Sequence, residues 1–347
     1  MRNWMVALAM VASAAAQNRN WASVTTLMEP WLKGDFASGA LGYEQFANGG
    51  YMPVRYRVDM ELELANYRFC SQLLKRDGEW SSTGWQMRRA RLLYLTGDIV
   101  GADHILQSKH LQYSDRMALH LMNTRGMIAL ARGNFAEANQ EFHKYLRVPR
   151  KLTEKIDEPE TILSLNGLTQ AEVPLGHLNA AEEYGTRALR LAQLSWGQFS
   201  IPALDSMQAL AEVRLAQHRM DDARKLIEDC ARERKKLYGK NPKVADIWEL
   251  GARYNLASGS AEAALNQAGG AMDMRQEIFG GPSLWSAEAL LTKGDVYAAI
   301  GALDQASRCY DNGVPVLESA LGADAPSVQK ARQRRDAIHA QMASATP

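Results

Sequence analysis

Apolar residues along the chain recur at the three- and four-residue spacing of amphipathic helices, whereas the alternating pattern of a strand is scarce. Between 17 and 37 this spacing is carried by Trp21, Val24, Leu27, Met28, Trp31 and Leu32. Gly34 ends that pattern, and a second helix is expected over 58–74, before Asp77-Gly78. From Trp85 onward the helical segments become regular, so the pattern predicts an all-α protein.

The regular part is a tandem repeat of about 42 residues, marked twice in every unit. Four small residues follow one another at intervals of 42, 41 and 42: Ala181, Ala223, Ala264 and Ala306. Each comes five residues after one position of a short turn, occupied by Gly176, His218, Gly259 and Gly301. A second marker, an aromatic residue or Leu before Gly, has the same period: Trp196-Gly197, Tyr238-Gly239, Phe279-Gly280 and Leu321-Gly322. Two markers with one period predict a stacked helical array.

The units before these are shorter. One contains Ala90, Gly97 and Ala102, and the next contains Gly126, Gly133 and Ala138. Ala102 and Ala138 lie 36 residues apart, whereas Ala138 and Ala181 lie 43 apart. The additional residues fall in a charged connection over 148–160, so the array is expected to change its unit length there.

After the last repeat, residues 327–342 are expected to form a helix that caps the array. Ser327 is a suitable N-cap residue, and four basic residues give the segment a solvated surface: Lys330, Arg332, Arg334 and Arg335. A basic run is also a candidate for nucleic-acid contact, but a polar outer face is what a terminal repeat needs, and the cap is the favoured interpretation.

These markers resemble the tetratricopeptide repeat, a helix-turn-helix unit with a small residue at its eighth position, a turn near its fifteenth and Ala at its twentieth. The longer units resemble those of kinesin light chains, whose helix pairs are joined by Leu-Gly, a short polar stretch, Pro and Val. Here that connection occupies 237–244 and 320–328. The resemblance covers about residues 85–330. It implies a solenoid of helix pairs wound into a right-handed superhelix.

Close packing explains the small residues of the first helices: Gly126, Ala211, Ala252 and Gly294. Several positions depart from the family pattern. Gly185 and Gln267 or Ala268 stand where an aromatic residue is usual, and His218 replaces a turn Gly. Individual units are therefore expected to be less stable than consensus repeats.

The predicted organisation has four parts: a candidate signal peptide over 1–16, an irregular helical segment with degenerate repeats over 17–84, the repeat array over 85–326, and the capping helix and tail over 327–347. Residues 1–16 carry Arg2 at their start, continue with an apolar stretch and end in small residues before Gln17, as secretory signals do. The alternative is a first repeat helix. An exported product would be periplasmic or extracellular, and an intact chain would be cytoplasmic.

The first helix of each pair lines the concave face in the family, so the family's groove positions were carried onto this sequence. The fifth position gives Asn123, Asn166, Gln208 and Glu249. The second and ninth positions give Asp205, Glu212, Asp246, Arg253, Glu288 and Asp295. Amides can hydrogen-bond an extended peptide backbone, and the acidic half implies a ligand with a basic end. The alternative is that these side chains are the ordinary solvated faces of amphipathic helices. The N-terminal end of the groove is more basic, with Arg88, Arg89 and Arg91.

Composition and motifs point away from catalysis. The formal net charge of the 347 residues is +1, which gives no general attraction to nucleic acid. The three cysteines, Cys70, Cys230 and Cys309, have no paired spacing, and the seven histidines are scattered. No His-Glu-x-x-His, phosphate-binding loop or Gly-x-Ser-x-Gly elbow occurs. We therefore expect no enzyme, no cofactor and no metal, and no segment long and apolar enough to cross a membrane.

Two functions fit these observations. The first is a non-enzymatic scaffold or adaptor that holds a peptide or a partner's helix in the concave groove. The second is a cytoplasmic regulatory sensor whose array binds a signalling peptide or a small ligand. An enzyme would need a pocket in the irregular segment, where Tyr43, Tyr51, Arg55, Tyr56 and Arg57 cluster, although such a cluster more often packs a cap against the first repeat.

Overall fold

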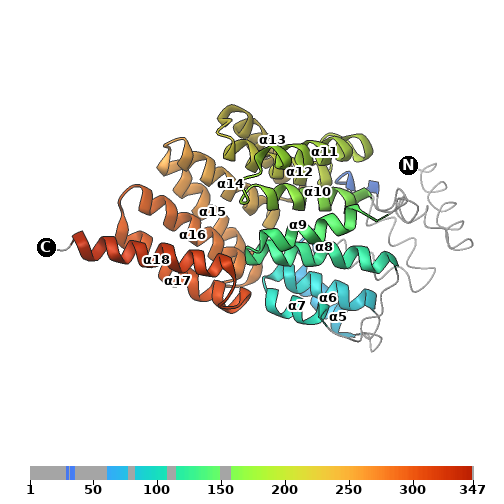
Figure 1. The fold of residues 1–347 in the computed structure, drawn as a ribbon, viewed down its shortest axis with the longest axis horizontal. Coiled ribbons are helices and arrows are strands. Elements are labelled where there is room, and N and C mark those ends of the chain that lie inside the picture. Colours follow the sequence, from blue (N-terminus) through green and yellow to red (C-terminus); the bar gives the residue numbers. More distant parts are fainter. Residues whose placement is uncertain are drawn as a thin grey trace, which may run out of the picture.

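The structure, a computed structural model, describes residues 29–30, 32–35, 61–76, 83–107, 115–148 and 158–345, and it contains no strand within these ranges. Helices follow one another in pairs (Figure 1). The first helices are α6 (Thr83–Thr96), α8 (Asp115–Arg132), α10 (Glu158–Glu172), α12 (Ile201–Ala216), α14 (Pro242–Ala257) and α16 (Leu284–Ala299). Their partners are α7 (Ile99–Leu106), α9 (Phe135–Leu146), α11 (Leu178–Trp196), α13 (Met220–Tyr238), α15 (Ala261–Phe279) and α17 (Leu303–Leu321). Helix α5 (Tyr67–Arg76) precedes the pairs, and α18 (Pro326–Ala345) follows them.

Both sequence markers have the structural role that the repeat predicted. The marker alanines are fully buried: Ala181, Ala223, Ala264 and Ala306. The second helices end at the residue before each marker Gly: Trp196, Tyr238, Phe279 and Leu321. His218, the residue that replaces a turn Gly, adopts φ = 57° and so keeps the left-handed conformation of the glycines at this position. The repeat prediction is thus confirmed at the level of single residues.

Small residues on the first helices allow close contact within a pair. A Cβ at Gly126 would lie 2.6 Å from the Phe142 ring, and one at Gly294 would lie 2.9 Å from the Tyr310 ring. Both rings are fully buried. The first helix therefore comes near enough to its partner only because no side chain intervenes.

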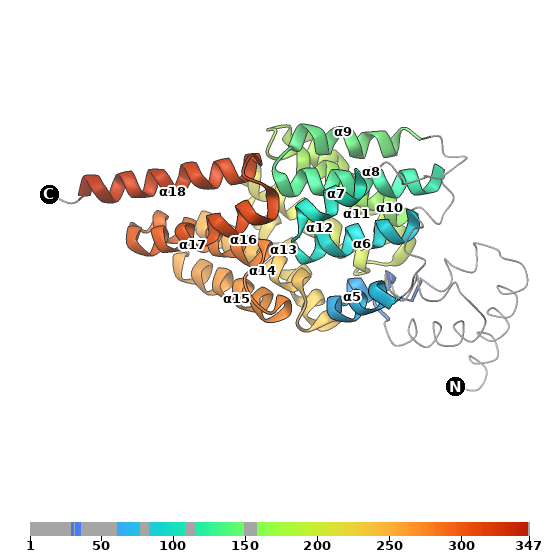
Figure 2. The ribbon, with the colours of Figure 1, turned by 90° about the horizontal axis from the view of Figure 1, so that it is seen from below.

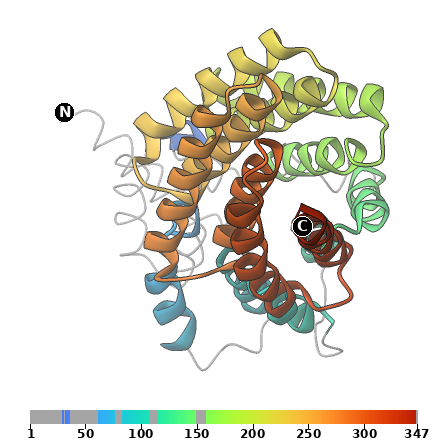
Figure 3. The same cartoon turned by 90° about the vertical axis from the view of Figure 1, so that its left-hand side faces the viewer.

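The pairs stack so that each first helix from α8 to α16 contacts the next first helix along the chain. Seen end-on, the pairs run around a central axis, with the first helices toward the inside (Figure 3). Figure 2 shows α17 and α18 extending along this axis beyond the rest of the array. The stack completes about one turn, because α7 contacts α17 and α8 contacts α18.

Where the turn closes, distant parts of the sequence form one core. A single cluster of buried residues joins Ala90, Ile99 and Leu121 to Leu284 and Tyr310. The Trp285 ring nitrogen donates a hydrogen bond to the Leu95 carbonyl at 2.9 Å, and the Tyr67 and Phe279 rings stack 5.6 Å apart. We call this line of contacts the seam, formed by Glu63, Tyr67, Leu95 and Arg132 on one side and by Tyr238, Lys243, Phe279, Trp285 and Ser327 on the other.

The helix expected over 58–74 is interrupted. Residues 61–63 are helical, Leu64 and Ala65 form a turn, and α5 begins only at Tyr67. Ala65 has φ = 59°, a left-handed conformation that ends a helix. Because this position is not a glycine, nothing in the sequence indicated the turn. The turn separates α5 from the short segment that carries Glu63.

The N-cap role expected for Ser327 is wrong. Helix α18 begins one residue earlier, at Pro326, and the Gln329 amide bonds back to the Ala325 carbonyl. Proline suits a first helical position because its missing N–H would have no partner there. The Ser327 hydroxyl instead donates to the carbonyl of Arg132 at 3.0 Å, at the end of α8.

Two predictions from the sequence fall outside the described residues, namely the candidate signal peptide over 1–16 and the aromatic and basic cluster between Tyr43 and Arg57. A third, the helix over 17–37, falls mostly outside them, since only 29–30 and 32–35 are described. Among the described helices, none combines the length and the apolarity needed to cross a membrane.

Candidate functional site

The ten side chains predicted to line a groove all lie on first helices, and we call them the inner row. Asn123 belongs to α8 and Asn166 to α10. Helix α12 carries Asp205, Gln208 and Glu212, helix α14 carries Asp246, Glu249 and Arg253, and helix α16 carries Glu288 and Asp295. Successive first helices from α8 to α16 contact one another, and the cartoon shows them toward the inside of the turn (Figure 3).

At the N-terminal end of the inner row, Asn123 joins two repeats. Its amide nitrogen donates to the side chain of Glu160 at 2.7 Å, and its amide oxygen accepts from Ser164 at 2.6 Å. His120 lies 3.0 Å from the other Glu160 oxygen. Burial alone would raise the pKa of Glu160, but His120 and Asn123 outweigh it and lower the pKa to about 2. The Asn123 amide is thus used inside the protein, in contrast to the free amide expected from the sequence.

Asn166 lies in the next repeat and is 7% exposed. Its amide oxygen is buried and has no hydrogen-bond partner within the described ranges. An unsatisfied buried acceptor costs about 1 to 3 kcal/mol. Asn166 is therefore a polar residue that the local packing does not use.

Farther along the inner row, a buried arginine from the second helix holds the carboxylate and the amide of α12. Arg234 of α13 is 2% exposed. It donates to Asp205 at 2.7 Å, to the side-chain oxygen of Gln208 and to the Lys243 carbonyl at 2.7 Å. One guanidinium thus ties α13 to its own first helix and to the start of the next repeat.

The same arrangement recurs in the following repeat. Arg275 of α15 donates to Asp246 at 2.7 Å, to Glu249 at 2.5 Å and to the Trp285 carbonyl at 2.5 Å. Thr292 on α16 donates to the other oxygen of Glu249 at 3.0 Å. Neither arginine is among the site residues predicted from the sequence, although Arg234 and Arg275 are 41 residues apart, the spacing that also separates Asp205 from Asp246.

These arginines keep their partners ionised. Burial would raise the pKa of Asp205, but Lys243 and Arg234 outweigh it and hold the pKa below its usual range. The pKa of Glu249 is lowered in the same way, mainly by Arg275 against the effect of burial. Both carboxylates are therefore negative at neutral pH and are neutralised by neighbours.

Glu288 differs from the other carboxylates of the inner row because no neighbouring cation keeps it ionised. It is half-buried and has no hydrogen bond or ion pair to the part of the chain that the structure describes. Burial and then the charge of Glu249 raise its pKa to about 8, although Arg275 opposes this shift. Glu288 therefore holds a proton at neutral pH.

The remaining charged residues of the inner row are paired across repeats. Arg253 lies 3.3 Å from Glu212, and Asp295 lies 2.8 Å from Arg334 of α18. Asp295 also accepts a hydrogen bond from Tyr310. The C-terminal half of the concave face, expected to be predominantly acidic, is thus largely neutralised by arginines on other helices.

One inner-row residue is also tied to the seam. The Lys243 ammonium, in the first turn of α14, lies 2.9 Å from Asp205 and 2.7 Å from Glu63. The Tyr238 hydroxyl donates to the same oxygen of Glu63 at 2.7 Å. Asp205 and the N-terminal segment therefore share one cation.

The described residues offer little for catalysis. They contain no group of three or more His, Cys, Asp or Glu side chains placed to hold a metal ion. Ser307, His339 and Asp311 come together, but Ser307 and Asp311 both approach the same ring nitrogen, Nε2, at 3.0 and 3.2 Å. A catalytic relay needs the carboxylate on the other nitrogen. Cys70, Cys230 and Cys309 are buried free thiols.

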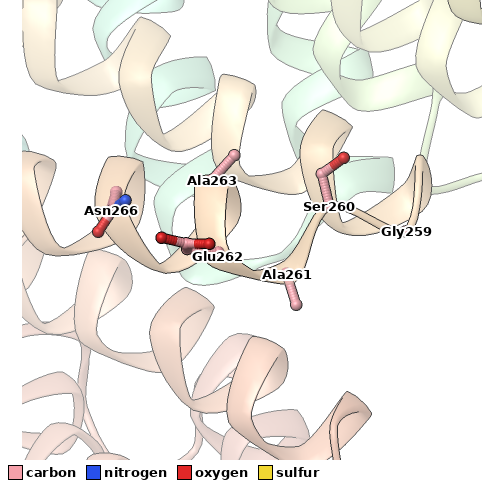
Figure 4. A pocket seen from close by; sticks show the side chains of 6 residues that line it. All are labelled: Gly259, Ser260, Ala261, Glu262, Ala263 and Asn266. Carbon is pink, nitrogen blue, oxygen red and sulfur yellow. The ribbon is translucent and has the colours of Figure 1, made fainter.

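A shallow hollow lies at the turn between α14 and α15, lined by residues 259–263 and Asn266 (Figure 4). Its volume is about 540 Å³, and it is wide open to solvent. Glu262 is its one charged side chain, and the other lining residues are small or neutral. Nothing at this turn converges on a ligand.

Comparison with known proteins identifies the fold. No family model matches the sequence, and no curated protein matches it. Among solved structures, the chain is similar to a Rap protein complexed with Competence and Sporulation Factor, with 12% identity and a TM-score of 0.59, covering 78% of this chain and 77% of that one. It is also similar to NprR in complex with its cognate peptide NprX, with 15% identity and a TM-score of 0.54, covering 82% and 84%.

Both solved proteins are built from tetratricopeptide-type repeats. At these identities the likeness shows the fold alone. The chain thus has the fold of tetratricopeptide-type repeat proteins, an α-helical solenoid of helix pairs, as the sequence markers predicted.

Proposed function

We propose that the chain is a non-enzymatic interaction scaffold that binds a peptide, or a helix of a partner protein, along the concave side of its array. The observation that carries this proposal is the inner row itself. Polar side chains occupy equivalent repeat positions on successive first helices. Asp205, Asp246 and Arg253 keep 36%, 39% and 46% of their side-chain surface exposed. An extended chain can meet such a row at regular intervals.

The comparisons add support. NprR, which has this fold, was solved with its cognate peptide, and the Rap protein was solved with Competence and Sporulation Factor. Binding of peptides is thus within the reach of a solenoid of this kind.

The ligand we propose carries a basic group opposite the C-terminal half of the inner row. Arg234 and Arg275 neutralise much of that half, so the attraction is local and centres on Glu288. A cation placed beside Glu288 would favour its ionised form, and the proton that the residue holds at neutral pH would pass to solvent water.

A peptide library tests the proposal. Peptides selected on the full chain would be titrated against Glu288→Gln and Arg253→Gln, both on the inner row, and against Glu262→Gln on the outer turn as a matched control. We expect at least one inner-row variant to weaken binding about tenfold, or about 1.4 kcal/mol, and the control to bind as the wild type does. Equal weakening by the outer variant would refute the concave site.

Asp246 and Glu249 are unsuitable targets for this experiment, because each holds the buried Arg275. Their loss would disturb the fold and the site together. Asn166→Ala is suitable, since the Asn166 amide oxygen has no partner among the described residues.

The second candidate is a cytoplasmic regulatory sensor that binds a signalling peptide or a small ligand with the same surface. The N-terminus separates the two. A protein recovered from its host with a chain beginning near Gln17 would favour an exported scaffold, and an intact first residue would favour the sensor. Mass spectrometry of the recovered protein gives this answer directly.

A further inference from the structure

A single lysine connects the inner row to the seam. The Lys243 ammonium lies 2.9 and 3.1 Å from the two carboxylate oxygens of Asp205, and 2.7 Å from a carboxylate oxygen of Glu63. Asp205 belongs to the proposed peptide site, whereas Glu63 belongs to the segment before α5. One cation therefore serves two carboxylates that are far apart in the sequence.

Glu63 is held at this position by more than the lysine. The Tyr238 hydroxyl donates to the Glu63 side chain at 2.7 Å, and the Asn241 amide donates to the Glu63 carbonyl at 3.1 Å. The left-handed turn at Ala65 follows directly. The segment over 61–66 is thus fastened to the connection between α13 and α14.

Two carboxylates and two cations meet here, and the cations differ in accessibility. The side chain of Arg234 is 3% exposed and is fixed by Gln208 and the Lys243 carbonyl as well as by Asp205. Lys243 is 24% exposed, and its ammonium ends a flexible four-carbon stem. Burial alone would lower the pKa of Lys243, but Asp205 and Glu63 outweigh it and raise the pKa. Lys243 is the cation that another cation can replace.

We infer that Lys243 is an internal occupant of an ammonium site between Asp205 and Glu63, and that it couples occupancy of the inner row to closure of the seam. The inference rests on the proposed function, since the occupant it anticipates from outside is a basic side chain of a bound peptide. Such a group meets both carboxylates only when the 61–66 segment is docked. By linkage, a basic ligand and the docked segment favour each other.

Chemical rescue of a truncated lysine tests this in the full-length protein. Lys243→Ala leaves Asp205 and Glu63 without their shared cation, so hydrogen exchange of the 61–66 backbone should become at least threefold faster. Added n-propylammonium, which matches the atoms removed from the lysine, should restore most of the protection. Neutral 1-propanol at the same concentration should not.

The chain offers a matched control three residues away. Lys240 lies on the same connection and pairs with Glu277 at 2.7 Å, but both side chains are more than 60% exposed and neither contacts the seam or Asp205. Lys240→Ala should leave exchange over 61–66 unchanged. Glu63→Gln should accelerate it, and n-propylammonium should fail to rescue that variant because one carboxylate of the site is gone.

Two results would overturn the inference. Unchanged exchange in Lys243→Ala would show that the lysine does not hold the segment, and accelerated exchange without rescue would show that the site accepts no external cation. Neither measurement uses a peptide, so their failure counts against the coupling alone. Failure of every selected peptide to depend on the inner row would count instead against the proposed function.

Discussion

Single residues depart from the repeat pattern at several positions, and His218 is the clearest case. It stands at a turn position where the next two units have Gly259 and Gly301, and it adopts their left-handed conformation with φ = 57°. A side chain makes that conformation unfavourable by about 1 to 2 kcal/mol. His218 is exposed, and its side chain makes no hydrogen bond or ion pair with the described residues that would offset this cost.

His218→Gly is therefore expected to stabilise the protein. Relief of backbone strain exceeds the additional chain entropy of glycine, which is about 0.5 to 1 kcal/mol, so the net gain should be about 0.5 to 1 kcal/mol. Urea unfolding measures it. The reciprocal change, Gly259→His at the equivalent turn, should destabilise by a similar amount, and a stabilising effect there would contradict the argument.

Glu288 predicts a pH dependence of stability. Its pKa is about 8 in the folded chain and about 4.3 in an unfolded one. Below about pH 4 the carboxyl is protonated in both states and its contribution is fully present. As the pH rises through this interval the unfolded state loses its proton first, so stability falls until about pH 8.

Glu288→Gln should remove this decline. Thermal melting from pH 5 to 9 should show the variant and the wild type converging at the acid end, with the variant more stable above pH 8. The exposed Glu262→Gln serves as the control and should run parallel to the wild type. A constant offset between Glu288→Gln and the wild type would refute the protonated state.

Elements are held to their neighbours by the two buried arginines. Arg275 is 3% exposed and links α15 to α14 and α16 through three hydrogen bonds, to Asp246, to Glu249 and to the Trp285 carbonyl. Removing one partner of a buried ion pair leaves an uncompensated charge. Arg275→Met should therefore destabilise by about 3 to 5 kcal/mol.

The triple variant Arg275→Met, Asp246→Asn, Glu249→Gln tests the cause. Because it removes the whole charge network, it should recover much of the stability that Arg275→Met loses, measured by urea unfolding of both proteins. A triple variant less stable than the single one would show that packing around Arg275, rather than charge, is decisive.

The sequence predicted elements well where a marker repeats. The marker Gly that it placed between successive helix pairs directly follows the last residue of α11, α13, α15 and α17, and each of these glycines has a positive φ. The sequence prediction failed at the start of α5, where Ala65 turns the chain without a glycine, and at Ser327, whose hydroxyl bonds to α8. Ser327 bonds to a remote segment, and the turn at Ala65 follows Glu63, which also contacts remote residues, whereas local patterns contain no such contacts.

Prediction of the candidate site had the same limit. Repeat register placed the ten residues on first helices, but it gave no information on their partners. Arg234 and Arg275 come from second helices, and Glu63 comes from the far end of the turn. The acidic character expected from first helices alone was therefore overestimated.

At the scale of the whole molecule, the seam joins the two ends of the turn. A substitution of Trp285 measures how strongly this contact stabilises them. Trp285→Phe keeps an aromatic ring beside Tyr94 but loses the hydrogen bond to Leu95. A hydrogen bond of this kind contributes about 1 kcal/mol. Exchange of amides in α6 should become about fivefold faster, although α6 lies some 190 residues away in sequence.

Trp196→Phe is the matched control, because the Trp196 ring nitrogen is buried without a partner in the described ranges. Its removal should be neutral or stabilising. If Trp285→Phe altered exchange only within α16, the two ends of the turn would be independent of each other.

The seam also has a consequence for the time during which the protein is made. The hydrogen bond between the Trp285 ring and the Leu95 carbonyl cannot form until Trp285 has been synthesised, 190 residues after Leu95. At bacterial to eukaryotic synthesis rates of about 5 to 20 residues per second, this interval is about 10 to 40 s. During it the apolar side chains of α6 to α8 that pack against α16 to α18 in the shared core lack those partners, so this part of the nascent chain is most exposed to aggregation before α16 leaves the ribosome. Chaperone demand should accordingly peak at that stage of translation and fall once α16 to α18 emerge.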